Sequence, residues 1–332
     1  MVNKSNSPIF FVGNCKELYP QFIKMKRSLG CKYYSEERML ANFDRFLLAE
    51  FPDLGENEIT QEAIERWDTK RPHESSKTHS SRKLVLRKFC EYSAMQGYNI
   101  FVSREKARYK SISTFVPHIY SDDELKRFFM AVDNHTRRKV MLSNTLFYPT
   151  LFRLLYCCGL RLMEALNLLV SDVDLEKRTL LIRDTKFGKD RNVPFGEELA
   201  KTLERYLRIS HFSKPSDYFF TSPRGGRYSG KTVGAAFHEF REKAGIYHGG
   251  RNKGPRIHDF RHTFAVTRLK KWFDEGADIQ TKLPVLSAYL GHCDLRGTQR
   301  YLRLTSQMYP RITRLFEDKF GDVFPKVGGI NG

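Results

Sequence analysis

The segment RIHDFRHTFAVTRL, residues 256–269, places basic and imidazole side chains in a helix-forming stretch. His258, Arg261 and His262 fall at positions i, i+3 and i+4, so they share one face of a helix. Two histidines at this spacing can bind zinc, but Arg261 would put a fixed positive charge beside the cation. A structural polar face is a second interpretation. The third makes Arg261 a phosphate ligand and His258 a group that transfers protons or donates hydrogen bonds.

A second basic motif stands upstream, in CCGLRLMEALNL, residues 157–168. Arg161 follows Gly159 at the start of a predicted helix, and Glu164 lies three residues on, on the same face. One interpretation is a buried ion pair that joins two helices. The other is that the guanidinium of Arg161 binds a phosphate bidentately while Glu164 orients it from behind. This segment alone leaves both interpretations open.

The segment LSAYLGHCDLRGTQRYLRLT, residues 286–305, places His292 after a glycine and Tyr301 nine residues later on a predicted short helix. A tyrosine at helical spacing usually packs into a core. A phenol is also a competent nucleophile toward phosphorus where cationic neighbours stabilise the phosphate and the developing phenolate. Tyr301 therefore needs the basic groups of the other segments around it.

The composition of the whole chain favours a polyanionic partner. Its 332 residues carry 57 Lys and Arg against 38 Asp and Glu, a formal net charge of +19, and 40% of them are hydrophobic. These values exclude a disordered chain and favour nucleic acid as the partner. The longest apolar run, around residues 151–162, is interrupted by two arginines and is too short to span a membrane. The six cysteines form no C-x-x-C pair and are given no role.

One β signal stands between the motifs, in LLIRDTKFGKDRNVPF, residues 180–195, which predicts two strands joined by a turn. Helical periodicity elsewhere makes the predicted fold mainly α with a small antiparallel β-sheet, an α+β protein. We expect Lys189 and Arg191 to be solvated surface or non-specific DNA-phosphate contacts. Lys186, at the mouth of the hairpin, is expected to donate a proton to a leaving sugar oxygen.

Two domains are predicted from the helical pattern. Four short helices are expected within residues 15–97, and a basic, polar stretch from about residue 103 to residue 120 interrupts the pattern. Ser121 and Glu124 then match a capping box, with which a new helical region begins. The predicted parts are an N-terminal helical DNA-binding domain of residues 1–110, a linker of residues 111–120, and a catalytic domain with a C-terminal tail helix of residues 121–332.

In this order along the chain, the motifs resemble those of the tyrosine recombinase (phage integrase) family, whose members include mobile-element integrases and Xer-like enzymes. The resemblance rests on G-L-R-x-x-E, on H-D-x-R-H-T-F, and on L-G-H with a tyrosine nine residues later, with a lysine hairpin between the first two. It covers about residues 120–310. The N-terminal part is similar to the family's core-binding domain by helical pattern only. The implied architecture is a two-domain clamp around duplex DNA.

The resemblance implies a role for each motif residue. Tyr301 is the implied nucleophile, and Arg161 and Arg261 bind the scissile phosphate. Lys186 is the implied general acid for the 5′-oxygen, and His258 is a general acid or base.

Two further positions are implied to support the same site. His292 stands where the family has His or Trp beside the phosphate, and Glu164 matches an acidic position behind the first arginine. The turn departs from the common G-K-G-x-K-x-R pattern, because a threonine precedes Lys186. Lys189 therefore competes with Lys186 for the role of general acid, and we favour Lys186.

The implied reaction uses no metal, ATP or other cofactor. Attack by the tyrosine leaves a 3′-phosphotyrosine and a free 5′-hydroxyl, and two arginine forks supply the charge stabilisation that a metal would otherwise give. The implied assembly is a homotetramer on double-stranded DNA, formed from a monomer or weak dimer, in which the C-terminal helix docks on the neighbouring protomer. We expect a prokaryotic cytoplasmic protein, associated with the nucleoid and not with a membrane.

The biological role has competing interpretations. Integration and excision of a mobile element is favoured over Xer-type resolution of chromosome dimers, because DIQTKLPVLSAYLGH, residues 278–292, resembles integrases of transposons and conjugative elements. A non-cleaving DNA-binding regulator with the same fold is disfavoured, because every expected catalytic residue type is present. A type IB topoisomerase shares the chemistry but would relax supercoils as a monomer.

Overall fold

The structure is a computed structural model, in which two compact units can be described. They lie within Met1–Thr114 and Phe115–Gly332. The described residues are 9–103, 116–135, 142–183, 190–210, 212, 214–250, 254–292 and 296–308. Across these ranges, no helix combines the length and the apolar character needed to cross a membrane.

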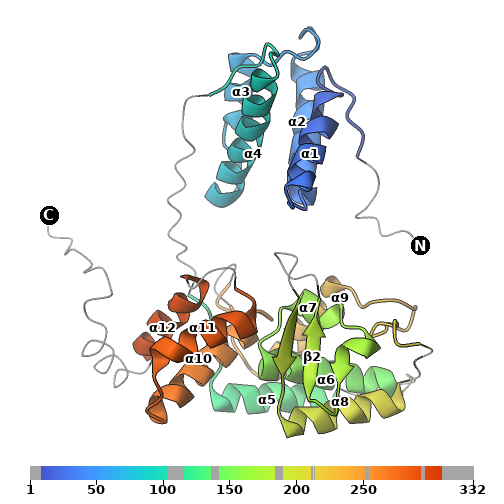
Figure 1. Cartoon of the computed structure of the whole chain (residues 1–332), viewed down its shortest axis with the longest axis vertical. Coiled ribbons are helices and arrows are strands. Elements are labelled where there is room, and N and C mark those ends of the chain that lie inside the picture. The colour runs from blue at the N-terminus through green and yellow to red at the C-terminus, as the bar shows by residue number, and fades with distance from the viewer. Residues whose placement is uncertain are drawn as a thin grey trace, which may run out of the picture. The chain divides into compact units, whose positions relative to one another are not determined.

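The N-terminal unit is built from helices (Figure 1). They are α1 (Leu18–Ser28), α2 (Tyr34–Glu50), α3 (Gln61–Asp68) and α4 (Ser76–Met95). One apolar stripe of each helix enters a common core, in which the rings of Phe22 and Phe89 lie 5.6 Å apart. The hydroxyls of Thr60 and Ser75 accept backbone N–H groups at the starts of α3 and α4. The four helices predicted within residues 15–97 are therefore present.

A buried ion pair ties the connection between α3 and α4 to α4 itself. Arg82 donates through Nε and Nη2 to the two carboxylate oxygens of Glu74, at 3.0 Å each, and also to the carbonyls of Trp67 and Thr69. Only 5% of the Arg82 side chain and 7% of the Glu74 side chain are exposed. The hydrogen bonds from Arg82 hold the pKa of Glu74 at about 2, although burial alone would raise it.

Arg82→Ala is expected to destabilise the N-terminal unit by about 3 to 5 kcal/mol, because it leaves the Glu74 carboxylate buried without its partner. Chemical denaturation at neutral pH measures the change in the free energy of unfolding. Arg66→Ala is the control, because Arg66 and Glu50 pair on the surface with about half of each side chain exposed, and such pairs contribute about 0 to 1 kcal/mol. Equal losses in the two variants would contradict the predicted role of Arg82.

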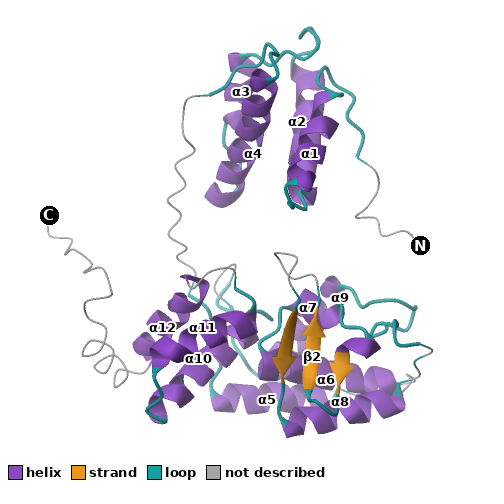
Figure 2. Cartoon of the chain, in the orientation of Figure 1, coloured by secondary structure: helices purple, strands orange, loops and turns teal. Residues whose placement is uncertain are grey.

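The C-terminal unit combines helices with a small sheet (Figure 2). Its helices are α5 (Asp122–Asp133), α6 (Leu142–Cys158), α7 (Leu162–Leu166), the 3₁₀ turn η1 (Val170–Asp172), α8 (Glu197–Ile209), α9 (Gly230–Lys243), α10 (Asp259–Asp274), α11 (Ile279–Leu290) and α12 (Arg296–Met308). The predicted capping box is confirmed at α5. The Ser121 hydroxyl accepts the N–H of Glu124, and the Glu124 carboxylate accepts the N–H of Ser121 at 2.9 Å.

The sheet is antiparallel, with strand order β1-β2-β3. Strands β2 (Thr179–Ile182) and β3 (Arg191–Pro194) form the predicted hairpin, with Leu180 paired to Val193 in the core. Strand β1 (Val173–Asp174) was not predicted, because two residues are too few to show an alternating pattern. The predicted class, mainly α with a small antiparallel sheet, is confirmed.

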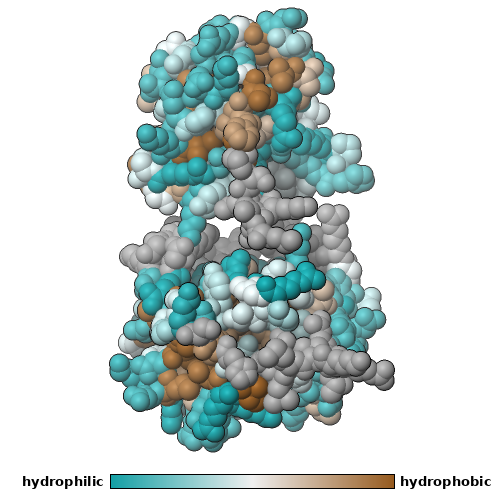
Figure 3. Space-filling view, turned by 90° about the vertical axis from the view of Figure 1, so that its right-hand side faces the viewer, coloured by the Kyte–Doolittle hydropathy of each residue, from teal (hydrophilic) through white to brown (hydrophobic). Residues whose placement is uncertain are grey.

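Two hydrophobic clusters fill the C-terminal unit. One joins α5, α6, α8, α9 and the sheet, and the other joins α10, α11 and α12. Helix α10 packs against α6 and α12, so it lies where the two clusters meet; Figure 1 shows it beside α11 and α12 in orange to red. The surface in Figure 3 is mainly hydrophilic, with small hydrophobic patches on both units. The three motif segments belong to α7, α10 and the α11–α12 pair.

Candidate active site

Arg261 is buried in the first turn of α10 and joins two other motifs. Its exposed fraction is 1%, its Nη1 donates to the Gly159 carbonyl at 2.8 Å, and its Nη2 donates to the Leu290 carbonyl. Gly159 follows α6 with φ of +58°, and a Cβ there would lie 2.7 Å from the ring of Phe264. Glycine adopts this backbone conformation without strain and leaves room for the ring, so the first motif's glycine also places a ligand for Arg261.

Arg161 stands immediately before α7 and is held by its own motif and by the third one. Its Nη1 donates to Glu164 at 2.6 Å, and its Nη2 donates to the Gly291 carbonyl at 3.2 Å. Glu164 also accepts the backbone N–H of Arg161 at 2.9 Å. The Glu164 side chain is 9% exposed, whereas that of Arg161 is 30% exposed. The predicted ion pair is present, and the guanidinium still reaches solvent.

Arg191 corrects an expectation, because it is not a solvated hairpin residue. Its guanidinium donates to both oxygens of Glu164, at 2.8 and 3.2 Å, and to the Tyr289 carbonyl at 2.9 Å, and its side chain is 10% exposed. The expectation of a solvated surface position is therefore wrong for Arg191, whereas its contact with DNA phosphates stays a prediction. Strand alternation could have revealed it, because Arg191 lies two residues from buried Val193 and so on the same face.

The backbone carbonyls at the C-terminal end of α11 accept hydrogen bonds from all three of these arginines. Tyr289, Leu290 and Gly291 accept from Arg191, Arg261 and Arg161, respectively. The carbonyls at a helix C-terminus have no partner within the helix and carry partial negative charge, which favours cations there. Gly291 has φ of +66°, and a Cβ there would lie 2.8 Å from Nη1 of Arg191. The glycine of L-G-H thus makes room for an arginine from the hairpin.

Tyr301 lies on α12 between two imidazoles and is only 2% exposed. Its ring centroid is 5.4 Å from that of His262 and 5.9 Å from that of His292, whose ring is nearly parallel to it. Nδ1 of His292 pairs with the Thr298 hydroxyl at 2.7 Å, which leaves Nε2 for other partners. His258 precedes α10, and its ring lies 4.8 Å from that of His262. His262 was seen in the sequence to share this face but was given no separate role.

Burial and the neighbouring arginine charges together set the protonation of these groups. Burial, reinforced by arginine charges, lowers the pKa of His258 to about 4 and that of His292 to about 4. Burial also lowers the pKa of His262 to about 3. For Tyr301, burial raises the phenol pKa while the charge and hydrogen bonding of Arg261 oppose the rise. Neutral imidazoles and a neutral phenol beside fixed positive charges make a site suited to an anion.

The structure brings together Arg161, Glu164, His258, Arg261, His292 and Tyr301. The two lysines predicted in the turn, Lys186 and Lys189, lie outside the described residues. Within the described residues, no cluster of three or more His, Cys, Asp or Glu side chains could hold a metal ion.

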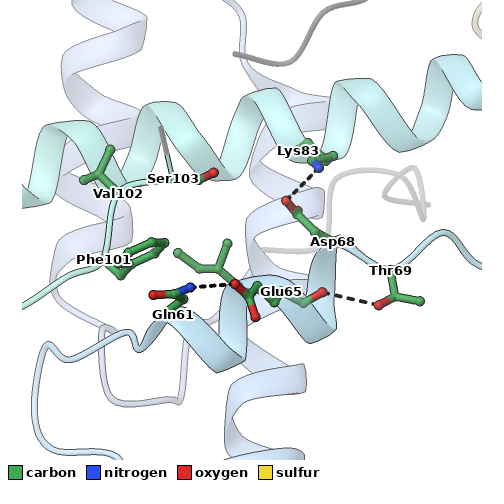
Figure 4. A pocket seen from close by; sticks show the side chains of 9 residues that line it. Gln61, Glu65, Asp68, Thr69, Lys83, Phe101, Val102 and Ser103 are labelled. Atoms are coloured by element: carbon green, nitrogen blue, oxygen red, sulfur yellow. Dashed lines mark hydrogen bonds and ion pairs between the residues drawn. The ribbon is translucent and has the colours of Figure 1, made fainter. Parts of the chain in front are cut away.

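A pocket of about 600 Å³ is found in the N-terminal unit. Figure 4 shows Lys83 pointing toward Asp68 at its edge, with their charged atoms 3.1 Å apart, and Gln61 donating to Glu65 at 2.7 Å. Its polar side chains are thus engaged with one another, and it holds none of the motif residues. The candidate active site is therefore the arginine and tyrosine cluster.

Comparison with known proteins decides the family. Residues 120–308 match the Phage integrase family. The chain belongs to this family. The phage integrase relatives include a Sinorhizobium fredii protein named as integrase/recombinase y4rB, 32% identical over 92% of this chain and 98% of its own length. Tyrosine recombinase XerA of Pyrococcus horikoshii is 31% identical over 68% of this chain and 70% of its own length.

A solved structure of the phage integrase fold agrees with the architecture. XerH site-specific recombinase bound to a palindromic difH substrate aligns with a TM-score of 0.63 at 18% identity, covering 91% of this chain and 84% of that one. The predicted family is confirmed, and with it the class of tyrosine-type, site-specific recombination enzymes.

Glu164→Gln is expected to destabilise the protein at neutral pH by on the order of 3 kcal/mol, because Arg191 and Arg161 lose the buried carboxylate that they share. Burial alone would raise the pKa of Glu164, but hydrogen bonds and charge from Arg191 and Arg161 lower it from 4.5 to about 2. The contribution of the ionised Glu164 carboxylate to folding stability is thus complete above pH 4.5 and is lost as the pH falls through 2.

The measurement is urea unfolding of both proteins between pH 7 and pH 3. The difference in the free energy of unfolding between wild type and Glu164→Gln should be constant above about pH 4.5 and should decrease below it. Glu197→Gln is the control, because this carboxylate is 58% exposed. A gap that does not narrow in acid would contradict the assigned ionisation of Glu164.

Proposed function

We propose that this member of the phage integrase family cleaves and rejoins double-stranded DNA at a specific site, with Tyr301 as the nucleophile. The observation that carries the proposal is the placement of the Tyr301 phenol against Arg261 and between two imidazoles. Three solved recombinases of this fold support a DNA substrate, because XerH, the Tn1549 integrase and lambda integrase are each described bound to DNA.

The proposed reaction follows from the charges at the site. The scissile phosphate binds the guanidinium hydrogens of Arg161 and Arg261 that are not engaged with carbonyls or with Glu164. Attack of the Tyr301 oxygen forms the O–P bond of a 3′-phosphotyrosine and breaks the bond to the 5′-oxygen. The fixed arginines stabilise the added negative charge without reorganising, which is the property of a preorganised oxyanion site. A 5′-hydroxyl then reverses the step on the exchanged strand.

The remaining motif residues are proposed as supports for this step. His292, oriented by Thr298, donates to a phosphate oxygen through Nε2. Neutral His258 hydrogen-bonds the phosphate or exchanges a proton with it. Lys186, with Lys189 as the competitor, protonates the leaving 5′-oxygen. No metal, ATP or other cofactor enters the proposed steps.

We propose the integration and excision of a mobile element as the biological role. The resemblance of residues 278–292 to transposon integrases supports it, as does the relative named as an integrase/recombinase. Chromosome-dimer resolution is the second candidate, because XerA of Pyrococcus horikoshii is a relative of similar identity. In either role the protein would act as a homotetramer on DNA, at the nucleoid of a prokaryotic cell.

Tyr301→Phe is expected to abolish covalent attachment to DNA, because no oxygen remains to attack phosphorus. Wild type and variant are expressed in cells that carry the DNA flanking this gene, lysed in detergent, and the covalently bound DNA is sequenced. Tyr247→Phe is the matched control, because Tyr247 is 85% exposed and should trap DNA like wild type.

The pattern of trapped DNA separates the alternatives. Attachment at one short site in wild type alone would support the proposal and identify the target. Scattered attachment would favour a topoisomerase. If no protein traps DNA, even on nicked substrates that block religation, the recombinase proposal fails and a DNA-binding regulator replaces it.

Deletion of residues 310–332 is expected to abolish tetramer formation on paired sites while single-site binding persists. The reason is the amphipathic pattern of RLTSQMYPRITRLFEDKF, which we propose docks on a neighbouring protomer. Gel mobility on one-site and two-site DNA measures both properties. If the truncated protein forms tetramers as the wild type does, the proposed docking on a neighbouring protomer is wrong.

A further inference from the structure

Arg191 lies at the candidate active site, but the proposed reaction gives it no part. It begins β3, and its side chain is 10% exposed. Its Nε donates to the Tyr289 carbonyl at 2.9 Å, and its Nη1 and Nη2 donate to the two oxygens of Glu164 at 3.2 and 2.8 Å. A two-bond contact with a carboxylate is the geometry that the planar guanidinium fork suits and that a lysine cannot reproduce.

Glu164 divides its hydrogen bonds evenly between two arginines. It accepts the backbone N–H and Nη1 of Arg161, at 2.9 and 2.6 Å, together with the two bonds from Arg191. A carboxylate offers about four acceptor positions, so these bonds occupy it fully. Burial would raise the pKa of Glu164, but hydrogen bonds from both arginines and the charge of Arg191 lower it to about 2. One negative charge is therefore shared by two positive ones.

The two arginines differ in exposure. The exposed fraction of the side chain is 30% for Arg161, against 10% for Arg191 and 9% for Glu164. Arg161 is therefore the member of this group that a DNA phosphate reaches, and Arg191 lies deeper in the protein. If Arg191 were neutral, Glu164 would pair with Arg161 alone, and that pair would present no net charge to the phosphate.

The charge of Arg191 also acts on the imidazole of His292. Burial is the main cause that lowers the pKa of His292 to about 4, and the charges of Arg261, Arg161 and Arg191 are among those that lower it further. His292 is the group that the proposed reaction places on a phosphate oxygen. A positive charge that disfavours a proton on His292 favours an anion beside it, because the two interactions have opposite sign.

We propose that Arg191 is a positioning residue that acts through Glu164. It holds this carboxylate in place and offsets its charge, so that Arg161 keeps its own positive charge for the scissile phosphate. This inference rests on the proposed function. Arg191 is held by a carboxylate and by a carbonyl at a helix end. It therefore stays in place while the phosphate gains negative charge, and the compensation needs no reorganisation.

The test varies the charge of the phosphate in synthetic duplexes of the DNA site recovered by trapping. One duplex has the ordinary scissile phosphate. The other has a methylphosphonate, in which a methyl group replaces a non-bridging oxygen and removes the negative charge. Arg191→Gln is expected to slow covalent complex formation on the phosphate about 10-fold, less than the roughly 100-fold or more that follows loss of a donor in direct contact. On the methylphosphonate the loss should be about 3-fold or less, because less negative charge is stabilised there.

Removal of Glu164 as well supplies the second part of the test. In the double variant with Glu164→Gln and Arg191→Gln, the carboxylate that would neutralise Arg161 is gone. The double variant is therefore expected to regain most of the rate that Arg191→Gln loses on the phosphate. Arg191→Lys keeps the charge without the fork, so the ratio of its rates on the two duplexes should stay close to that of wild type.

Arg183→Gln is the matched control. Arg183 directly follows β2 on the same hairpin, and its Nε donates at 2.6 Å to Asp172, whose side chain is 2% exposed. This substitution removes an arginine from a buried carboxylate outside the candidate active site. The ratio of rates on the two duplexes should therefore equal that of wild type.

The outcomes separate this inference from the proposed function. Equal losses on the two duplexes would give Arg191 a purely structural role, and a double variant as slow as Arg191→Gln would point to direct contact of Arg191 with the phosphate. Either result overturns the inference, although the recombinase function stands. If thermal melting shows that Arg191→Gln misfolds, the double variant decides: a wild-type ratio supports the inference and a lower ratio overturns it. If wild type forms no covalent complex with the ordinary duplex, both the function and this inference fall.

Discussion

The carbonyl groups at the C-terminal end of α11 are the constraint on which the site depends. They receive guanidinium groups from the segment before α7, from β3 and from α10. These three elements are distant in the sequence. The carbonyls at one helix end are held rigidly by the helix and can accept hydrogen bonds from all three elements together. The site is thus assembled on backbone dipoles, whose direction is set by the helix and does not depend on side-chain rotamers.

This arrangement also explains why the site keeps a positive charge. Glu164 is shared between Arg161 and Arg191, whereas the described hydrogen bonds of Arg261 run to two carbonyls. Dipoles satisfy hydrogen-bond donors without cancelling their charge, and the one carboxylate pairs with only two of the three arginines, so net positive charge remains. Burial lowers the pKa of His258, His262 and His292, and the surplus positive charge lowers it further. An anionic phosphate is the partner that such a field favours.

Much of the fold and part of the site could be predicted from the sequence. Helical periodicity and the capping box at Ser121 are local signals, and both hold in the structure. The pairing of Arg161 with Glu164 could be predicted because Glu164 lies three positions after Arg161, on the same helix face.

The rest depends on contacts between distant segments. Arg191 looked like a hairpin surface residue until its long-range partners, Glu164 and the Tyr289 carbonyl, were in view. The strand β1 was too short to carry a pattern.

The contact between Gly291 and Arg191 has an evolutionary consequence. A side chain at position 291 would occupy the space of the guanidinium, and the positive φ already disfavours one. A larger residue there would have to displace the Arg191 guanidinium one hundred positions earlier, and even without that arginine the positive φ would still favour glycine. Substitutions at these two positions, far apart in the gene, are therefore expected to depend on each other, and any redesign of the hairpin has to consider both.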